Sequence, residues 1–380
     1  MKIGILTLRL HANYGGILQA YALMTVLKRL GHEPVLIYNQ SFKYRSFISR
    51  AILYCTNICK KFLLGQRRLE VFRERRFKNI YETVCGNTRK FVDIHLTPRT
   101  DFVVTENDWR SLQQKYHFDA YVVGSDQVWR PAYTDAVEHF FLSFLSDDYP
   151  LRISYAASFG TDNWTFTDCQ TAICQQLLKR FQAVSVREDS AVQLCESRLG
   201  YRPVHVLDPT MLLLKCDYLN LVPNFQGESR GLLVYVLDHT EEKSSVVMNV
   251  ANELHESCFF VNNKDAENEE KQCAERVAPP VEDWLKGFAS AKYVITDSFH
   301  ACVFSILFHI PFYVIGNESR GNARILSLLR MFHLEPQRQV LFKVELMSVL
   351  RVNWSEVDCL LDEYRQSSLS FLIQSLVRKQ

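Results

Sequence analysis

Short apolar runs alternate with stretches of helical periodicity along the first half of the chain. Lys2–Thr7 is predicted to be a strand, and Gly15–Leu30 a helix that closes at Gly31. Further strands are predicted at Pro34–Tyr38, Phe118–Val123, Arg152–Ala156, Ala183–Val186 and Val204–Leu207. Apolar strands that alternate with helices predict a mainly parallel sheet with helices on both faces.

The same alternation restarts in the second half. It predicts strands at Gly231–Leu237, Cys258–Val261, Tyr293–Thr296 and Pro311–Ile315, and a helix at Ser244–His255. We therefore expect an α/β fold of two Rossmann-like domains that face a central cleft. The expected divisions are an N-terminal domain on the acceptor side (1–208), an irregular linker (209–230), a C-terminal domain (231–350) and a helix that packs back on the first domain (351–380).

Composition narrows the class of protein. The 380 residues exceed one ordinary core, and 47% hydrophobic with 23% charged residues is typical of a globular protein. A net charge of +2 gives no electrostatic reason to expect nucleic acid. The longest apolar stretch, Ala301–Gly316, is shorter than the roughly 20 residues of a membrane span. Because Met1-Lys2 leads directly into a strand instead of a signal peptide, we expect a cytoplasmic protein.

The eleven cysteines are scattered and lack the paired spacing of zinc sites. We expect most of them to be buried core residues, and we expect no metal.

One segment is far more basic than the chain as a whole. Residues 43–78 hold eleven Lys or Arg against two Glu, with apolar residues between them. Such a segment can lie on an anionic membrane surface, which favours peripheral contact with the inner face of the cell membrane. The alternative is a set of solvated helix faces whose apolar side covers the first domain.

Four loops fall where an open α/β sheet binds its ligands, beyond the carboxyl ends of strands. Helix N-termini at these places suit a phosphate or carboxylate. The loops are His11–Gly16, Gly124–Gln127, Arg187–Ser190 and Thr296–His300.

Each loop also has an ordinary structural interpretation. The glycine pair Gly15-Gly16 is compatible with simple turn chemistry, and Asp126 and Asp297 with N-caps. Arg187 could pair with a neighbouring carboxylate at the surface. His300 precedes an apolar run and could be a core histidine.

The same loops carry a resemblance. In this order, the segments resemble motifs of the polysaccharide pyruvyl transferase family: His11–Tyr21, Val123–Trp129, Ser154–Gly160, Val186–Glu188, Thr296–His300 and Arg320–Arg324 with Leu326–Leu329. The resemblance covers about residues 1 to 335 and implies a two-Rossmann arrangement like that of the GT-B glycosyltransferases. One departure is Ala301-Cys302, where family members commonly carry Gly-Thr after the histidine.

The resemblance implies phosphoenolpyruvate as donor substrate and a glycan as acceptor, free or linked to a lipid diphosphate, with no cofactor. Arginine suits the phosphate and carboxylate of that donor, so Arg187, Arg320 and Arg324 are candidate donor ligands together with Ser298. His300 is the candidate general acid or phosphate-stabilising group, and Asp126 or Asp297 is the candidate to deprotonate the sugar hydroxyl or to orient His300. The remaining cleft-loop candidates are Asn13, Tyr14, Gly15, Gly16, Ser125 and Gln127.

Two other functions stay open. A GT-B glycosyltransferase would use a nucleotide sugar and would need a loop that recognises the nucleotide. The acidic residues near the second sheet, Asp265, Glu267, Glu269 and Glu270, resemble a solvated surface instead. A scaffold protein of polysaccharide assembly would not need Arg187, His300 and Arg320 to converge.

Overall fold

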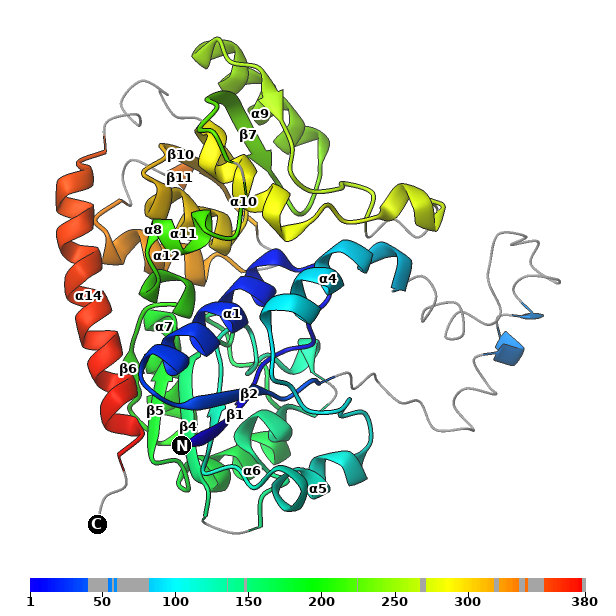
Figure 1. The fold of residues 1–380 in the computed structure, drawn as a ribbon, viewed down its shortest axis with the longest axis vertical. Coiled ribbons are helices and arrows are strands. Elements are labelled where there is room, and N and C mark those ends of the chain that lie inside the picture. The colour runs from blue at the N-terminus through cyan, green and yellow to red at the C-terminus, as the bar shows by residue number, and fades with distance from the viewer. Residues whose placement is uncertain are drawn as a thin grey trace.

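In the computed structural model the chain forms two α/β bodies, which lie one above the other in Figure 1. Each body is built on a parallel sheet, so the predicted fold class is confirmed. The structure describes residues 1–39, 54–56, 58–59, 82–134, 136–146, 149–223, 225–266, 271–317, 321–334, 339–340 and 352–377.

The first body contains a six-stranded sheet in the order β2-β1-β3-β4-β5-β6. Its strands are β1 (Lys2–Leu6), β2 (Glu33–Leu36), β3 (Ala120–Val123), β4 (Leu151–Ala157), β5 (Ala183–Val186) and β6 (Val204–His205). All neighbouring pairs are parallel, which places the carboxyl ends of the strands along one edge.

The described helices of the first body are α1 (Tyr14–Arg29), α4 (Gly86–His95), α5 (Glu106–Tyr116), α6 (Asp168–Leu178) and α7 (Asp189–Leu194). Three of them, α1, α5 and α6, begin at a side-chain cap. Thr105 and Thr167 start α5 and α6 with capping boxes. Asn13 starts α1, where its Oδ1 accepts a hydrogen bond of 3.1 Å from the backbone N–H of Gly16. This cap fixes the loop before α1.

The second body has the strand order β11-β10-β9-β7-β8. Its strands are β7 (Arg230–Tyr235), β8 (Cys258–Phe259), β9 (Ala291–Thr296), β10 (Phe312–Ile315) and β11 (Gln339–Val340), and its helices are α9 (Glu241–Leu254), α10 (Val281–Ser290), α11 (Phe299–Phe308) and α12 (Ala323–Met331). Every residue of α11 is buried, which explains why its sequence is apolar on all sides.

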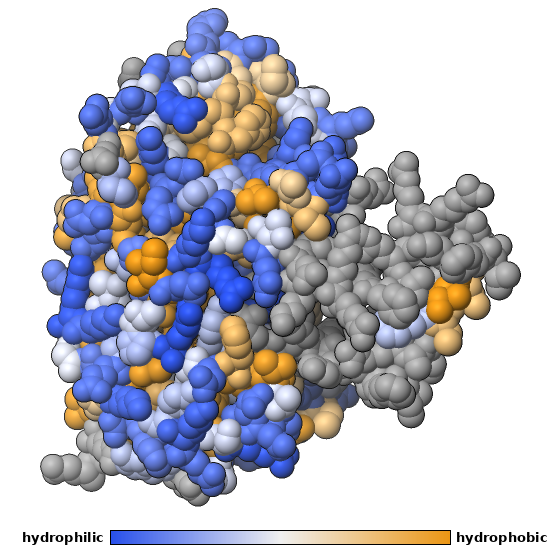
Figure 2. Space-filling model, turned by 45° about the vertical axis from the view of Figure 1, so that its right-hand side comes forward, coloured by the Kyte–Doolittle hydropathy of each residue, from blue (hydrophilic) through white to orange (hydrophobic). Residues whose placement is uncertain are grey.

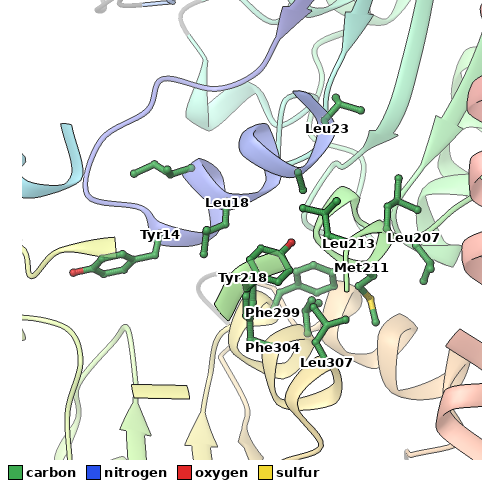
Figure 3. Close-up of a cluster of buried hydrophobic side chains, with 14 of the residues drawn as sticks. Tyr14, Leu18, Leu23, Leu207, Met211, Leu213, Tyr218, Phe299, Phe304 and Leu307 are labelled. Carbon is green, nitrogen blue, oxygen red and sulfur yellow. The ribbon is translucent and has the colours of Figure 1, made fainter. Parts of the chain in front are cut away.

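The two bodies share one apolar core. Figure 3 shows Tyr14 of α1 pointing away from the centre of this core, and Leu18 of the same helix facing Phe299 and Phe304 of α11. Tyr218 lies between them, with its ring centroid 4.8 Å from that of Phe304. The sequence suggested an irregular linker over 209–230, but this segment contributes α8 (Lys215–Leu219) and buried side chains because its apolar residues join this core.

The helix α14 (Trp354–Ser375) runs along one side of both bodies (Figure 1). Ser368 Oγ accepts a hydrogen bond of 3.0 Å from the backbone N–H of Leu207 in the first body. Asp358 contacts His309 of the second body at 2.8 Å. The helix therefore bridges the two bodies.

On the face in Figure 2, hydrophilic side chains predominate and apolar ones are scattered in small groups. Within the described ranges, no helix is both long and apolar enough to span a bilayer. The basic segment 43–78, apart from residues 54–56 and 58–59, lies outside the described residues, so its predicted membrane contact stays a prediction.

The expectation that most cysteines are core residues is wrong. The buried ones are Cys85, Cys174, Cys195 and Cys302, whereas Cys55, Cys59, Cys169, Cys216 and Cys359 are exposed. Most of the exposed ones lie on the outer faces of helices, where their neighbours are polar.

Candidate active site

A fully buried carboxylate, Asp208, lies just after β6 and faces both bodies. Its Oδ1 accepts hydrogen bonds from the backbone N–H and the hydroxyl of Thr210 at 3.0 and 2.6 Å. Its Oδ2 accepts one from Ser125 Oγ at 2.8 Å. Burial alone would raise the pKa of the Asp208 carboxyl, but its interaction with His300 and the charge of Arg187 hold that pKa well below its ordinary value.

Arg187 follows β5 and lies under the same carboxylate. Its Nη1 donates to Asp208 Oδ2 at 2.8 Å, and its Nη2 is 3.7 Å from Asp126 Oδ1. The ring of Phe299, from the second body, covers the guanidinium at 4.5 Å. Burial alone would lower the pKa of Arg187, yet the two carboxylates raise it above its ordinary value. Among the described residues, Arg187 Nε and Nη2 have no hydrogen-bond partner.

His300 enters this cluster from the first turn of α11. Its Nε2 lies 3.6 Å from Asp208 Oδ2, slightly beyond hydrogen-bond distance, and the side chain is only 8% exposed. The other side of the ring lies against Gly15, at the start of α1. A Cβ built on Gly15 would overlap the ring at Nδ1. A glycine is therefore needed at position 15 because His300 occupies the space of its side chain.

Asp126 connects the loop after β3 to the loop before α1. Its backbone is left-handed, with φ of 76°. Its Oδ2 accepts a hydrogen bond of 3.3 Å from Asn13 Nδ2, and its Oδ1 accepts one of 2.9 Å from the Gln127 N–H. A Cβ on Gly16 would press on Asn13 and Asp126. These contacts bring together five of the predicted residues: Asn13, Gly16, Asp126, Gln127 and Arg187.

Arg324 is a second buried cation beside Arg187. It lies in the first turn of α12, with its guanidinium 5.9 Å from the Phe299 ring. Burial and then repulsion from Arg187 lower the pKa of Arg324 to about 10. Ser298, just before α11, is also buried, and its backbone N–H donates to Thr296 Oγ1 at 3.0 Å. Arg320 lies outside the described residues.

Asp297 precedes His300 by three residues, but its carboxylate is bound within the second body. Its Oδ2 accepts hydrogen bonds from Lys243 Nζ at 2.7 Å and Asn317 Nδ2 at 2.9 Å. Its Oδ1 accepts one from the Leu237 N–H at 2.7 Å. Asp297 therefore links the segments after β7 and β10 to α9, and it does not belong to the Asp208 cluster.

The other predicted loop residues make contacts within the first body and between the two bodies. Tyr14 OH donates to the carbonyl of Pro279 at 2.9 Å, and its ring stacks on Trp284 at 5.8 Å. Gln127 Oε1 accepts from Arg130 at 2.7 Å and lies against Gly160, where a Cβ would overlap it. Gly321 of the second body has φ of 83°, and a Cβ built on it would overlap the carbonyl oxygen of Gly160.

Sequence reasoning missed the buried Asp208, and it did not select the buried Glu188 as a site residue although the segment Val186–Glu188 contains it. Asp208 follows β6, the same position relative to a strand that singled out the other loops, and this signal could have found it. Glu188 Oε1 accepts hydrogen bonds from the hydroxyl of Ser158 and from two backbone N–H groups. In the part of the chain that the structure describes, no three His, Cys, Asp or Glu side chains group as metal ligands.

Comparison with known proteins identifies a matching protein family and solved structures with a similar fold. The model of a family described as polysaccharide pyruvyl transferase matches residues 13–319. No curated protein matches the sequence. Among solved structures, the UDP-GlcNAc 2-epimerase of Methanocaldococcus jannaschii in complex with UDP-GlcNAc and UDP is similar, with a TM-score of 0.50 and 10% identity over 98% of this chain and 99% of that one. The UDP-GlcNAc 2-epimerase of Neisseria meningitidis bound to UDP-GlcNAc gives 0.50 and 9% over 99% of both chains. At these identities the likeness shows the GT-B-like fold alone.

Proposed function

Because the chain belongs to the polysaccharide pyruvyl transferase family, we propose that it moves the pyruvyl group of phosphoenolpyruvate onto a sugar of a cell-surface polysaccharide precursor. The product is a cyclic pyruvate ketal. The observation that carries the proposal is the Arg187 guanidinium, which is buried yet leaves Nε and Nη2 without a hydrogen-bond partner among the described residues. A buried donor without an acceptor is costly, and a bound phosphate or carboxylate would supply the acceptor.

The charges around Arg187 support an anionic donor. Arg324 is buried close enough for the two guanidiniums to repel each other. Phosphoenolpyruvate carries a phosphate and a carboxylate, and it would offset that repulsion. The start of α11, where Ser298 and His300 lie, adds the partial positive charge of a helix N-terminus.

The reaction needs proton transfer but no oxidation. A proton is added to the methylene carbon of the donor, and one sugar hydroxyl attacks C2. The C2–O bond to phosphate breaks, and a second hydroxyl attacks C2 to close the ring. Of the two protons that the hydroxyls lose, one balances the new methyl group and the other leaves with the phosphate. His300 is the group that we expect to hold a proton in these steps.

Isothermal titration calorimetry tests the donor. We expect the wild-type protein to bind phosphoenolpyruvate and a panel of nucleotide sugars to give no heat of binding. Arg187→Ala would leave the buried Asp208 and Asp126 without their cation, so Arg187→Lys is the better variant. It keeps the charge but loses the planar fork, and it should weaken phosphoenolpyruvate binding by about tenfold. Binding of a nucleotide sugar instead would indicate a glycosyltransferase.

A further inference from the structure

The two ring nitrogens of His300 face opposite surroundings. Nε2 points toward Asp208 Oδ2 at 3.6 Å, and both atoms are enclosed by protein. The Nδ1 side lies against Gly15, in the first turn of α1. Nε2 therefore faces an anion, and the first turn of a sixteen-residue helix packs against the ring at Nδ1.

The charges around His300 indicate which ring nitrogen carries the proton when the ring is neutral. Asp208 pairs with Arg187 Nη1 at 2.8 Å and accepts hydrogen bonds from the hydroxyls of Ser125 and Thr210, so its carboxylate is ionised and attracts an N–H group. The N-terminus of α1 carries partial positive charge and favours a lone pair over an N–H. The other charged groups at this place are Arg187, which shares Asp208 Oδ2 with His300, and Asp126, which contacts Arg187 Nη2.

We propose that Asp208 is a positioning residue that holds the proton of neutral His300 on Nε2. Nδ1 then carries the lone pair, and in the proposed reaction a proton passes through this nitrogen. This second part rests on the proposed function, whereas the position of the proton is a property of the protein alone. The arrangement parallels the carboxylate that fixes the histidine tautomer in serine hydrolases, with the two nitrogens exchanged.

Long-range ¹H–¹⁵N NMR of the protein with ¹⁵N-labelled histidine tests the tautomer. The His300 signals are assigned by their loss in His300→Gln. With the ring neutral, we expect Nε2 to resonate as a protonated nitrogen and Nδ1 as one with a lone pair. The reverse pattern in the wild type would overturn the proposal, and this result needs no variant of Asp208.

The role of Asp208 itself is tested with Asp208→Asn, which keeps the shape and removes the charge. Removing the charge weakens the electrostatic attraction that favours Nε2–H, so the Nδ1–H tautomer should gain about fivefold in population. The matched control is Thr210→Val, which removes a hydrogen bond to Asp208 Oδ1 but leaves the Oδ2 side intact. An unchanged tautomer ratio in Asp208→Asn would remove the positioning role, as would an equal shift in Thr210→Val.

Phosphoenolpyruvate added to the labelled wild type separates the two proposals. Where it binds, the Nδ1 signal of His300 should move more than the Nε2 signal. A larger movement at Nε2 would overturn the assignment of Nδ1 as the nitrogen through which the proton passes. If calorimetry detects no binding, phosphoenolpyruvate is excluded as the donor. The spectrum of the free protein would still show which nitrogen of His300 carries the proton.

Discussion

Two buried aspartates, Asp208 in the first body and Asp297 in the second, differ in how their binding partners are hydrogen-bonded. Asp297 binds Lys243, Asn317 and a backbone N–H, and Lys243 Nζ reaches it at 2.7 Å. Asp208 binds Arg187, which keeps two nitrogens without hydrogen-bond partners among the described residues, and faces His300 beyond hydrogen-bond distance.

The difference separates a structural cluster from a candidate functional one. Asp297 has its hydrogen-bonding capacity filled by groups of its own body, which is typical of a buried charge that stabilises a fold. The Asp208 cluster joins both bodies and leaves donors unfilled, which is costly unless a ligand completes it. The predictions below test this contrast, from the largest expected effect on free energy to the smallest.

The largest effect should follow from Lys243→Met. It leaves the buried Asp297 carboxylate without its cation, and breaking a buried pair in this way costs about 3 kcal/mol of unfolding free energy. Urea unfolding measures the loss, and phosphoenolpyruvate affinity should stay within about twofold. The control is Lys292→Met, which breaks the more exposed pair with Glu256 and should cost less than about 1 kcal/mol. Equal losses in both variants would contradict the contrast.

His300→Gln should lower the rate of transfer by about a hundredfold or more, on the scale of a lost acid–base group. Because Nε2 makes no hydrogen bond within the described residues, the free energy of unfolding should change by less than about 1 kcal/mol. Release of phosphate from phosphoenolpyruvate in the presence of a glycan acceptor measures the rate. Wild-type turnover would exclude His300 from the mechanism, and the exposed His309→Gln is the control.

Gly15→Ala should lower the same rate by about tenfold, because a misplaced catalytic group loses its alignment with the substrate. The added methyl group would occupy the space of the His300 ring, so the ring must move. Gly86→Ala is the matched control: it also lies in the first turn of a helix, and its Cβ would meet nothing within 4 Å. Equal activity of the two variants would show that His300 tolerates the displacement.

The smallest effect is expected at the partly exposed ion pair between the bodies. Arg330 binds Asp189 through two nitrogens, at 2.7 and 2.8 Å, with both side chains partly exposed. Arg330→Gln should cost less than about 1 kcal/mol of unfolding free energy and should leave phosphoenolpyruvate binding unchanged. A loss as large as that of Lys243→Met would mean that this pair is as important as the buried one.

The sequence predicted the two parallel sheets because strand periodicity is local. It also placed Arg187 and Asp126 correctly at loops beyond strand ends, where the structure brings them together. It could not tell in which direction Asp297 points, because the backbone between β9 and α11 turns its carboxylate toward Lys243. It overlooked Asp208 for a related reason: the partners of this residue come from three distant segments.

The shared apolar core has a consequence for experiments on parts of this protein. Side chains of α1, α8 and α11 belong to one continuous cluster. A cut in the segment 209–230 would expose that cluster on both fragments. We therefore expect that neither fragment can be purified as a folded, soluble protein. The two sheets should instead lose their structure in a single cooperative calorimetric transition, and a ligand that binds at Arg187 should raise the melting temperature of the whole chain.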